Sequence, residues 1–114
     1  MELIINNNLF NVKCSITDKD TQNGMMNKKF NDDYDGMLFL MKDEPHSFWM
    51  KNCIIPLDII FIKANSIIKI HHNCKPCITD ECDHYKGSGD MILEVLGGTC
   101  NKYDIVEGDR IYFN

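Results

Sequence analysis

Residues 57–72, LDIIFIKANSIIKIHH, contain two apolar segments separated by a short polar turn. The first segment, 57–62, begins directly after Pro56, and the second covers 67–72. Both are rich in isoleucine, which favours strands because its branched side chain packs well on a pleated sheet. The Asn-Ser pair at 65–66 is typical of a turn. The stretch therefore predicts a β-hairpin and, with it, a β-type fold.

Further strands are predicted on both sides of this hairpin, because short apolar or alternating runs are separated by turn-forming residues. They cover 9–16, 37–41, 47–52, 91–96 and the residues after Gly108. Two short helices are expected, one from the capping residue Thr17 to Gly24 and one within 98–105. We predict a mostly β, barrel-like or sandwich domain of six to seven strands with one or two short helices, in which residues 1–114 form a single domain.

The composition of the chain excludes some classes of function. Its 114 residues carry a formal net charge of −5, so the basic field required for broad nucleic-acid binding is missing. Without a long uncharged apolar run, no membrane span is expected. The first ten residues, MELIINNNLF, lack the features of a secretion signal, which predicts a cytoplasmic location.

A cysteine-rich stretch at 71–84, HHNCKPCITDECDH, is the clearest candidate for inorganic chemistry. One possibility is a tetrahedral zinc site, with ligands drawn from Cys74, Cys77, Cys82 and from His71, His72 or His84. A second is a disulfide between Cys77 and Cys82, which would close a short loop and stabilise the fold by about 2 kcal/mol. In a reducing compartment such a bridge would be labile or redox-active. The third possibility is that the thiols stay unpaired.

The segment FWMKNCIIPLDIIF, residues 48–61, predicts a ligand-binding surface. Trp49 is the only tryptophan, and Lys51 and Asn52 follow it closely. An aromatic wall beside a cation and an amide suits a small ligand. Asp58 lies within a very apolar strand, where a carboxylate is costly unless it is paired. Lys51 is the nearest cation in sequence, and it would lie opposite Asp58 if 47–52 and 57–62 were neighbouring strands.

Glu94, in MILEVL at 91–96, is a second carboxyl expected to point inward. Asp58 and Glu94 together could hold a hard cation such as magnesium. The same two acids, with Lys51, are therefore the candidate catalytic residues, although two separated acids are a weak signal. KGSG, residues 86–89, is interpreted as part of a flexible loop, because no helix-opening pattern follows it.

The sequence resembles domain-of-unknown-function family 192, a family of small bacterial and archaeal proteins. The resemblance rests on DGMLFLMKDEPHSFWMKNCIIPLDIIFIKANSIIKIHHNCKPC, on LEV at 93–95 and on EGDRI at 107–111. It implies a compact, mostly β, barrel-like fold with short helices, and it supplies no established activity. Cys77 and Cys82 match the family's cysteine pattern, and many relatives carry a signal peptide, with which a bridge would persist. Further matching positions are Trp49, Lys51, Asn52, Asp58 and Glu94.

Three hypotheses for function follow. The first is a small barrel that binds a small molecule or a protein around Trp49, Lys51, Asn52 and Asp58, with the loop 73–89 as a rim. The second is a metal-assisted hydrolase, acting on substrates such as phosphodiesters, that uses Asp58 and Glu94 with His71 or His84. The third is a redox or zinc site at Cys77 and Cys82.

Overall fold

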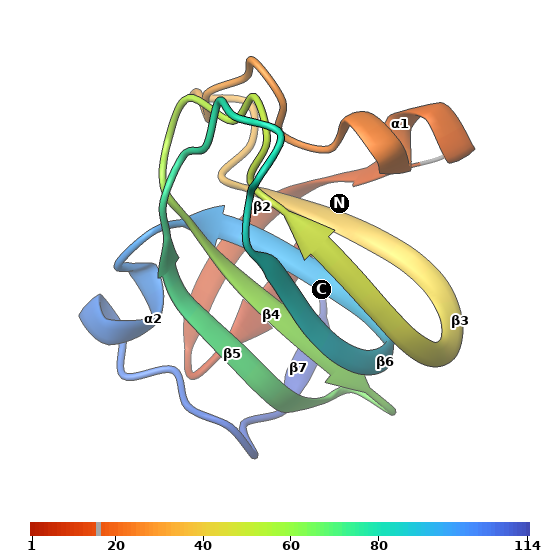
Figure 1. Ribbon diagram of the computed structural model, residues 1–114. Coiled ribbons are helices and arrows are strands. Elements are labelled where there is room, and N and C mark those ends of the chain that lie inside the picture. The colour runs from red at the N-terminus through yellow and green to blue at the C-terminus, as the bar shows by residue number, and fades with distance from the viewer. Residues whose placement is uncertain (16) are drawn as a thin grey trace.

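The computed structural model describes residues 1–15 and 17–114, and it contains one seven-stranded sheet with two short helices (Figure 1). The strands lie in the order β5-β4-β6-β3-β2-β1-β7. The bounds of the elements are β1 Glu2–Ile5, β2 Asn8–Ser15, α1 Asp18–Asn23, β3 Gly36–Trp49, β4 Leu57–Lys63, β5 Ser66–Cys74, β6 His84–Leu96, α2 Thr99–Lys102 and β7 Ile111–Phe113.

The sheet curls so that its two edge strands approach each other at one end. Ser66, at the start of β5, forms a bridge with Arg110, just before β7. The Ile67 amide donates to the Asp109 carbonyl at 2.8 Å, and the Gly108 amide donates to the Ile67 carbonyl at 2.8 Å. Curling brings the edges together and satisfies part of their backbone groups. The predicted barrel-like, mostly β fold is confirmed.

The hairpin at 57–72 is confirmed as β4 and β5, joined by a turn in which Ala64 and Asn65 have positive φ. The neighbours of β4 are β5 and β6, whereas β3 lies on the far side of β6. The condition under which Lys51 would lie opposite Asp58, that 47–52 and 57–62 are neighbouring strands, is therefore not met. Lys51 cannot lie opposite Asp58, because Asp58 is paired with Val95 of β6.

Strand β3 joins two segments that were predicted as separate strands, 37–41 and 47–52, and it folds back on itself. The rings of Phe39 and Phe48 pack edge to face, with 5.4 Å between their centroids. Nine residues of straight strand would separate them by about 30 Å. The register against β6 shifts between Leu40 and Glu44, which places the bend there (Figure 1).

Strand β6 begins at His84, so residues 84–89, the last third of the predicted loop 73–89, belong to a strand. A side chain at Gly87 would overlap the Phe61 ring, because a Cβ there would lie 2.6 Å from that ring. At Gly89 a Cβ would lie 2.4 Å from the carbonyl oxygen of Ile62. The two glycines let β6 lie against β4 at the bend. Residues 86–89 are therefore packed structure, and their interpretation as a flexible loop is wrong.

The short elements follow from their caps. The Thr17 hydroxyl accepts a hydrogen bond from the Asp20 amide at 3.0 Å, and Gly24 ends α1, as predicted. The second predicted helix is present as α2. The predicted strand at 9–16 is present as β2 as far as Ser15, and residue 16 lies outside the described residues. Strand β1 was not predicted. None of the helices in the described part of the chain has the length and hydropathy needed to cross a membrane.

Alternate side chains of β4 and β6 pack into two separate apolar clusters on opposite faces of the sheet. The first cluster includes Leu38, Ile60, Ile62, Leu93, Val95 and Cys100. The second includes Met25, Phe39, Cys53, Ile59, Phe61 and Ile92. Each cluster holds one buried carboxyl side chain, and the different surroundings of these two groups define the candidate site.

Candidate functional site

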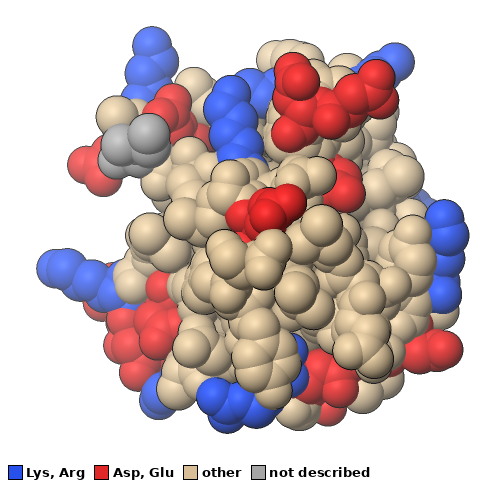
Figure 2. All heavy atoms as spheres, turned by 180° about the vertical axis from the view of Figure 1, so that it is seen from behind, with Lys and Arg blue, Asp and Glu red and all other residues tan. Residues whose placement is uncertain are grey.

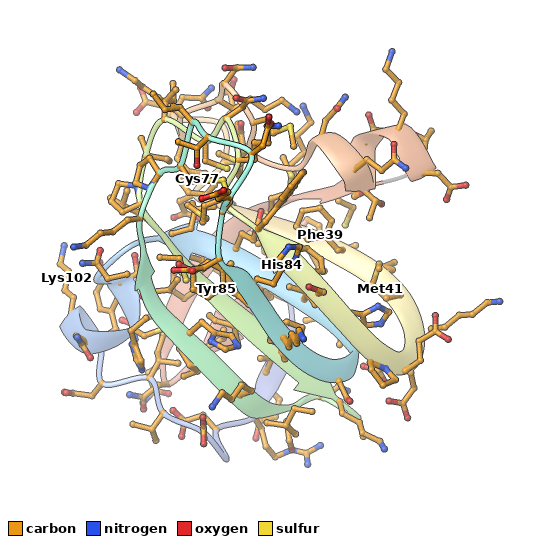
Figure 3. All side chains as sticks on the ribbon, in the orientation of Figure 1. Phe39, Met41, Cys77, His84, Tyr85 and Lys102 are labelled. Carbon is orange, nitrogen blue, oxygen red and sulfur yellow. A yellow bond between two sulfur atoms is a disulfide. The ribbon has the colours of Figure 1, made fainter. Side chains whose placement is uncertain are left out.

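A pocket of about 550 Å³ lies inside the bend of β3, beside the C-terminal end of α1. Figure 3 shows Phe39 and Met41 along β3 at this side of the molecule. The segment from Thr21 to Met26 forms one wall, and both arms of β3 form the other. The lining residues are Thr21, Gln22, Asn23, Gly24, Met25, Met26, Phe39, Met41, His46, Ser47, Phe48, Trp49, Cys53 and Glu94.

Aromatic rings and sulfur-containing side chains form most of the apolar wall. The Phe48 ring packs edge to face against both Phe39 and Phe61. Its centroid lies 5.4 Å from that of Phe39 and 6.0 Å from that of Phe61. Met25 is buried, and Met41 is partly buried beside the rings. Such a wall matches the usual composition of small-molecule sites, which are mostly apolar with a few well-placed polar groups.

Glu94 supplies the buried charged group of this pocket. Its side chain is only 4% exposed, and within residues 1–15 and 17–114 it has no hydrogen-bond partner. Burial raises the pKa of the Glu94 carboxyl from its ordinary value of 4.5 to about 8. At neutral pH burial therefore favours the protonated form of this carboxyl.

Gly24 keeps the space in front of this carboxyl open. A Cβ at Gly24 would lie 3.6 Å from Oε1 of Glu94 and 3.5 Å from the Phe39 ring. The φ of Gly24 is +47°, which glycine adopts at little cost. The residue that ends α1 therefore also leaves room for a ligand atom near the acid.

Asp58, the second buried carboxyl, is fully hydrogen-bonded within the protein. Its Oδ1 accepts from the amides of Asn73 at 2.7 Å and Gly98 at 3.2 Å, and its Oδ2 accepts from the Cys100 amide at 2.9 Å. These contacts join the end of β5 to the turn before α2. Asp58 is 0% exposed and does not line the pocket.

The two acids do not form one cation site. In the β4–β6 pairing Asp58 is opposite Val95, and Glu94 is opposite Ile59. They are therefore one step apart in register, and their side chains lie on opposite faces of the sheet. Among the described residues, no three His, Cys, Asp or Glu side chains could share a metal ion. The structure therefore does not bring Asp58 and Glu94 together around one magnesium ion, which the hydrolase hypothesis required.

Trp49 lies at the rim of the pocket and is 38% exposed. It stacks on His84 across the β3–β6 ladder, with 5.8 Å between the ring centroids. Lys51 Nζ lies 5.4 Å from the Trp49 ring centroid and forms an ion pair with Asp80. The structure therefore brings Lys51 to Trp49 but not to Asp58.

Asn52 belongs to the turn that follows β3 and does not line the pocket. Its φ is +61°, and its amide donates to the Cys77 carbonyl at 2.8 Å. Its carbonyl accepts from the Asn27 amide at 2.8 Å. The residue thus connects three loops through its backbone.

Cys77 and Cys82 are joined by a disulfide. Bridged sulfurs offer no thiolate, so Cys77 and Cys82 could hold zinc only in their reduced form. The two candidate histidines are also separated in their contacts. His71 Nε2 bonds to the Lys86 carbonyl at 2.7 Å, whereas His84 Nδ1 bonds to the Ser47 hydroxyl at 3.1 Å.

Sequence reasoning identified Trp49 and Glu94 but missed most of the pocket. The wall from Thr21 to Met26 comes from a segment that was interpreted only as a helix and its end. Met41 and His46 were not singled out, because their approach depends on the bend of β3. Only the methionine pair at 25–26, directly after a helix-ending glycine, could have indicated an apolar wall there.

No broad basic surface covers the opposite side of the molecule among the described residues (Figure 2). Figure 2 shows acidic and basic groups interspersed around this face, with uncharged surface between them. Together with the net charge of −5, this distribution indicates no broad basic surface on that face among the described residues.

Two solved structures share this fold closely. A protein of unknown function from Novosphingobium aromaticivorans has a TM-score of 0.86 and 26% identity, covering 98% of this chain and 84% of its own. A protein from Sinorhizobium meliloti, named provisionally as a transcription regulator, has a TM-score of 0.81 and 26% identity, covering 97% and 89%. Among curated proteins, none matches the sequence significantly.

The family comparison covers nearly the whole chain. The family model for domain-of-unknown-function family 192, described as an uncharacterized ACR, matches residues 2–113. The expected resemblance is confirmed, and the chain belongs to this family.

Proposed function

We propose that this protein binds a small organic molecule in the pocket between α1 and the bend of β3. The observation that carries the proposal is Glu94, a buried carboxyl that faces an open cavity with both apolar and polar walls and has no partner among the described residues. The cavity volume of about 550 Å³ falls within the range of about 300–1,000 Å³ that is usual for small-molecule sites.

An architectural role does not account for Glu94. A largely buried carboxyl without a protein partner destabilises a fold, because the group loses part of its hydration and gains no hydrogen bond from the protein in return. A residue such as glutamine or methionine would fill the position at lower cost. Strongly shifted carboxyls in clefts are candidates for function. Glu94 has a raised pKa, lies in a cleft and has no hydrogen-bond partner among the described residues.

The proposal modifies the binding site expected from the sequence. Trp49 remains at the rim, where a ligand would change its surroundings. Lys51 forms an ion pair with Asp80, and neither Asn52 nor Asp58 lines the pocket. We therefore assign ligand contact to Trp49 and Glu94, and an architectural role to Asp58.

The cytoplasmic location expected from the N-terminal residues remains a prediction, and the bridge between Cys77 and Cys82 offers a way to test it. Disulfides rarely persist in a reducing compartment. Thiols counted in denatured protein, taken directly from its native source under conditions that block exchange, would distinguish the two cases. Six free thiols agree with a cytoplasmic location, and four agree with an oxidising one.

A fragment screen by NMR, with mixtures of small aromatic amines, alcohols and acids, tests the proposed pocket. Hits should shift the amide signals of Ser47, Trp49 and Gly24. Met41→Trp should abolish these shifts, because the larger ring would occupy the cavity. Leu40→Trp is the matched control, since Leu40 is the preceding residue, is 59% exposed and does not line the pocket. Hits that bind equally to both variants would contradict the proposed site.

A further inference from the structure

We propose that the pocket selects small organic cations, namely a protonated amine or amidine on an apolar body, through an ion pair with Glu94. This inference rests on the proposed function and adds the chemical class of the ligand. The polar end of the ligand would reach the carboxyl through the space in front of Gly24. The apolar body would lie against Phe39, Phe48 and Met41.

The charges around the pocket favour a cation over an anion. The lining contains one carboxyl and no Lys or Arg. His46 is the second titratable group, and its Nε2 is occupied by the carbonyls of Lys42 at 2.8 Å and Gly89 at 3.2 Å. Cys53 is the third, and burial, with Glu94 nearby, raises the pKa of its thiol to about 12. An anionic ligand would therefore meet no Lys or Arg among the described lining residues.

One lysine lies close to the edge of the pocket. Lys28 Nζ donates to the carbonyl oxygen of Gly24 at 3.1 Å. It does not pair with Glu94, and the pKa of Glu94 is raised by burial, with no lowering contribution from a cation. The carboxyl is therefore available to a cation supplied by the ligand.

The apolar wall suits a cation as well. The faces of Phe and Trp rings attract cations through their negative π-electron surface. Phe39 and Phe48 contribute two such rings, and the polarizable sulfurs of Met25 and Met41 lie beside them. The net charge of −5 also favours the approach of a cation over that of an anion.

Pairing with a cation has a defined proton balance. Because the pKa of the free Glu94 carboxyl is about 8, the group enters the complex protonated at pH 7. The ligand's ammonium keeps its proton, and the carboxyl proton passes to the buffer as the ion pair forms. Close to one proton is therefore released for each amine bound. A neutral ligand that accepts a hydrogen bond from the acid would release none.

Three probes of similar shape separate the alternatives: benzylamine, benzyl alcohol and benzoate. Each would be titrated into the full-length protein at pH 7, with amide NMR for affinity and location and with calorimetry in two buffers for proton release. We expect benzylamine to bind at least about tenfold more tightly than benzyl alcohol, because charge-assisted hydrogen bonds are about twice as strong as neutral ones. We also expect it to release close to one proton.

Variants complete the test. Glu94→Gln keeps the shape but removes the charge, so benzylamine should bind it no better than benzyl alcohol does and should release no proton. Glu81→Gln makes the same change on an exposed loop and should bind like the unmodified protein. An unfolding curve and an amide spectrum check that each variant folds.

The outcomes distinguish the inference from the proposed function. Pocket shifts with equal affinity for alcohol and amine, or tighter binding of benzoate, would overturn the cation selectivity and leave the ligand-binding function standing. No pocket shift with any of the three probes would overturn both. Amine binding that survives Glu94→Gln unchanged would also overturn the role of the carboxyl.

Discussion

Asp58 and Glu94 are two buried carboxyls, one register step apart on neighbouring strands, and their surroundings could hardly differ more. Asp58 accepts three backbone hydrogen bonds on the face of the sheet that α2 covers. Glu94 faces a cavity on the other face and has no partner within the described residues. The sheet separates them because successive side chains of a strand point to opposite sides.

The difference shows that burial alone does not reveal what a charged residue does. In the sequence the two residues look the same, because each is a single acid within an apolar strand. The two residues differ in their hydrogen-bond partners. Asp58 holds loops together through backbone amides, whereas Glu94 faces a cavity. We propose that Asp58 stabilises the fold, whereas Glu94 lowers its stability at neutral pH and serves as a binding group for a ligand.

The largest loss of stability expected from a single substitution is at Asp58. In Asp58→Asn one acceptor oxygen becomes an NH₂ group, so a donor faces backbone donors that have no other partner. Leaving such groups unpaired should lower the free energy of unfolding by about 3 kcal/mol or more. Urea denaturation measures the change, with the exposed residue Asp43, substituted to Asn, as control. A loss below about 1 kcal/mol would show that Asp58 is not the architectural member of the pair.

The opposite behaviour is expected at Glu94, and it depends on pH. Between pH 4.5 and about 8 the unfolded chain has released this proton and the folded protein retains it. Stability contributed by this residue therefore falls as pH rises, by about 1.4 kcal/mol per pH unit, and levels off above pH 8. Glu94→Gln should remove this decline and be the more stable form at pH 7.5. If the free energies of unfolding of Glu94→Gln and of the unmodified protein changed with pH in parallel, the assignment of Glu94 as a buried acid without a partner would be contradicted.

The bridge between Cys77 and Cys82 allows a test of whether the loops above the pocket affect either carboxyl. Replacing both cysteines with alanine should cost about 2 kcal/mol in urea denaturation, because the bridge closes a short loop. The pH slope that Glu94 causes should remain, since neither cysteine lines the pocket. A changed slope would mean that the bridged loop controls how deeply Glu94 is buried.

The smallest effect is expected at Gly24. An alanine there must adopt φ +47° with ψ −125°, a sparsely populated combination for a residue with a Cβ, which costs about 1 kcal/mol or more. Its Cβ would also fill part of the space in front of Glu94. Gly24→Ala should therefore weaken benzylamine binding more than it weakens the fold, as NMR titration and urea denaturation would show. Asn27 already has a positive φ outside the lining, so Asn27→Ala is a control for backbone strain alone.

The sequence predicted those parts of the fold whose signals are local. The hairpin at 57–72 has two isoleucine-rich runs and a turn, and Thr17 and Gly24 mark both ends of α1. The fold-back of β3 could not be predicted, because it depends on pairing with β6 more than forty residues away. Residues 86–89 were misread for a related reason. Glycine usually marks a turn, and here it allows two strands to pack closely.

The candidate site could also be predicted only in part, because only local signals are visible in the sequence. Asp58 and Glu94 stand out as acids in apolar runs, so their burial could be foreseen. The partners of Asp58 are backbone amides, which leave no pattern in the side chains. The cavity in front of Glu94 forms between α1 and two arms of one bent strand, and no sequence periodicity reports such an arrangement.

The most direct test of the account is an NMR titration of the Glu94 side-chain carboxyl carbon with pH, in the free protein and with saturating benzylamine. The account predicts a pKa of about 8 in the free protein, because the carboxyl is buried and unpaired. It predicts a clear fall of that pKa when the amine is bound, because the ammonium stabilises the charged form. A pKa near 4.5 in the free protein, or one that the amine does not lower, would contradict the central claim.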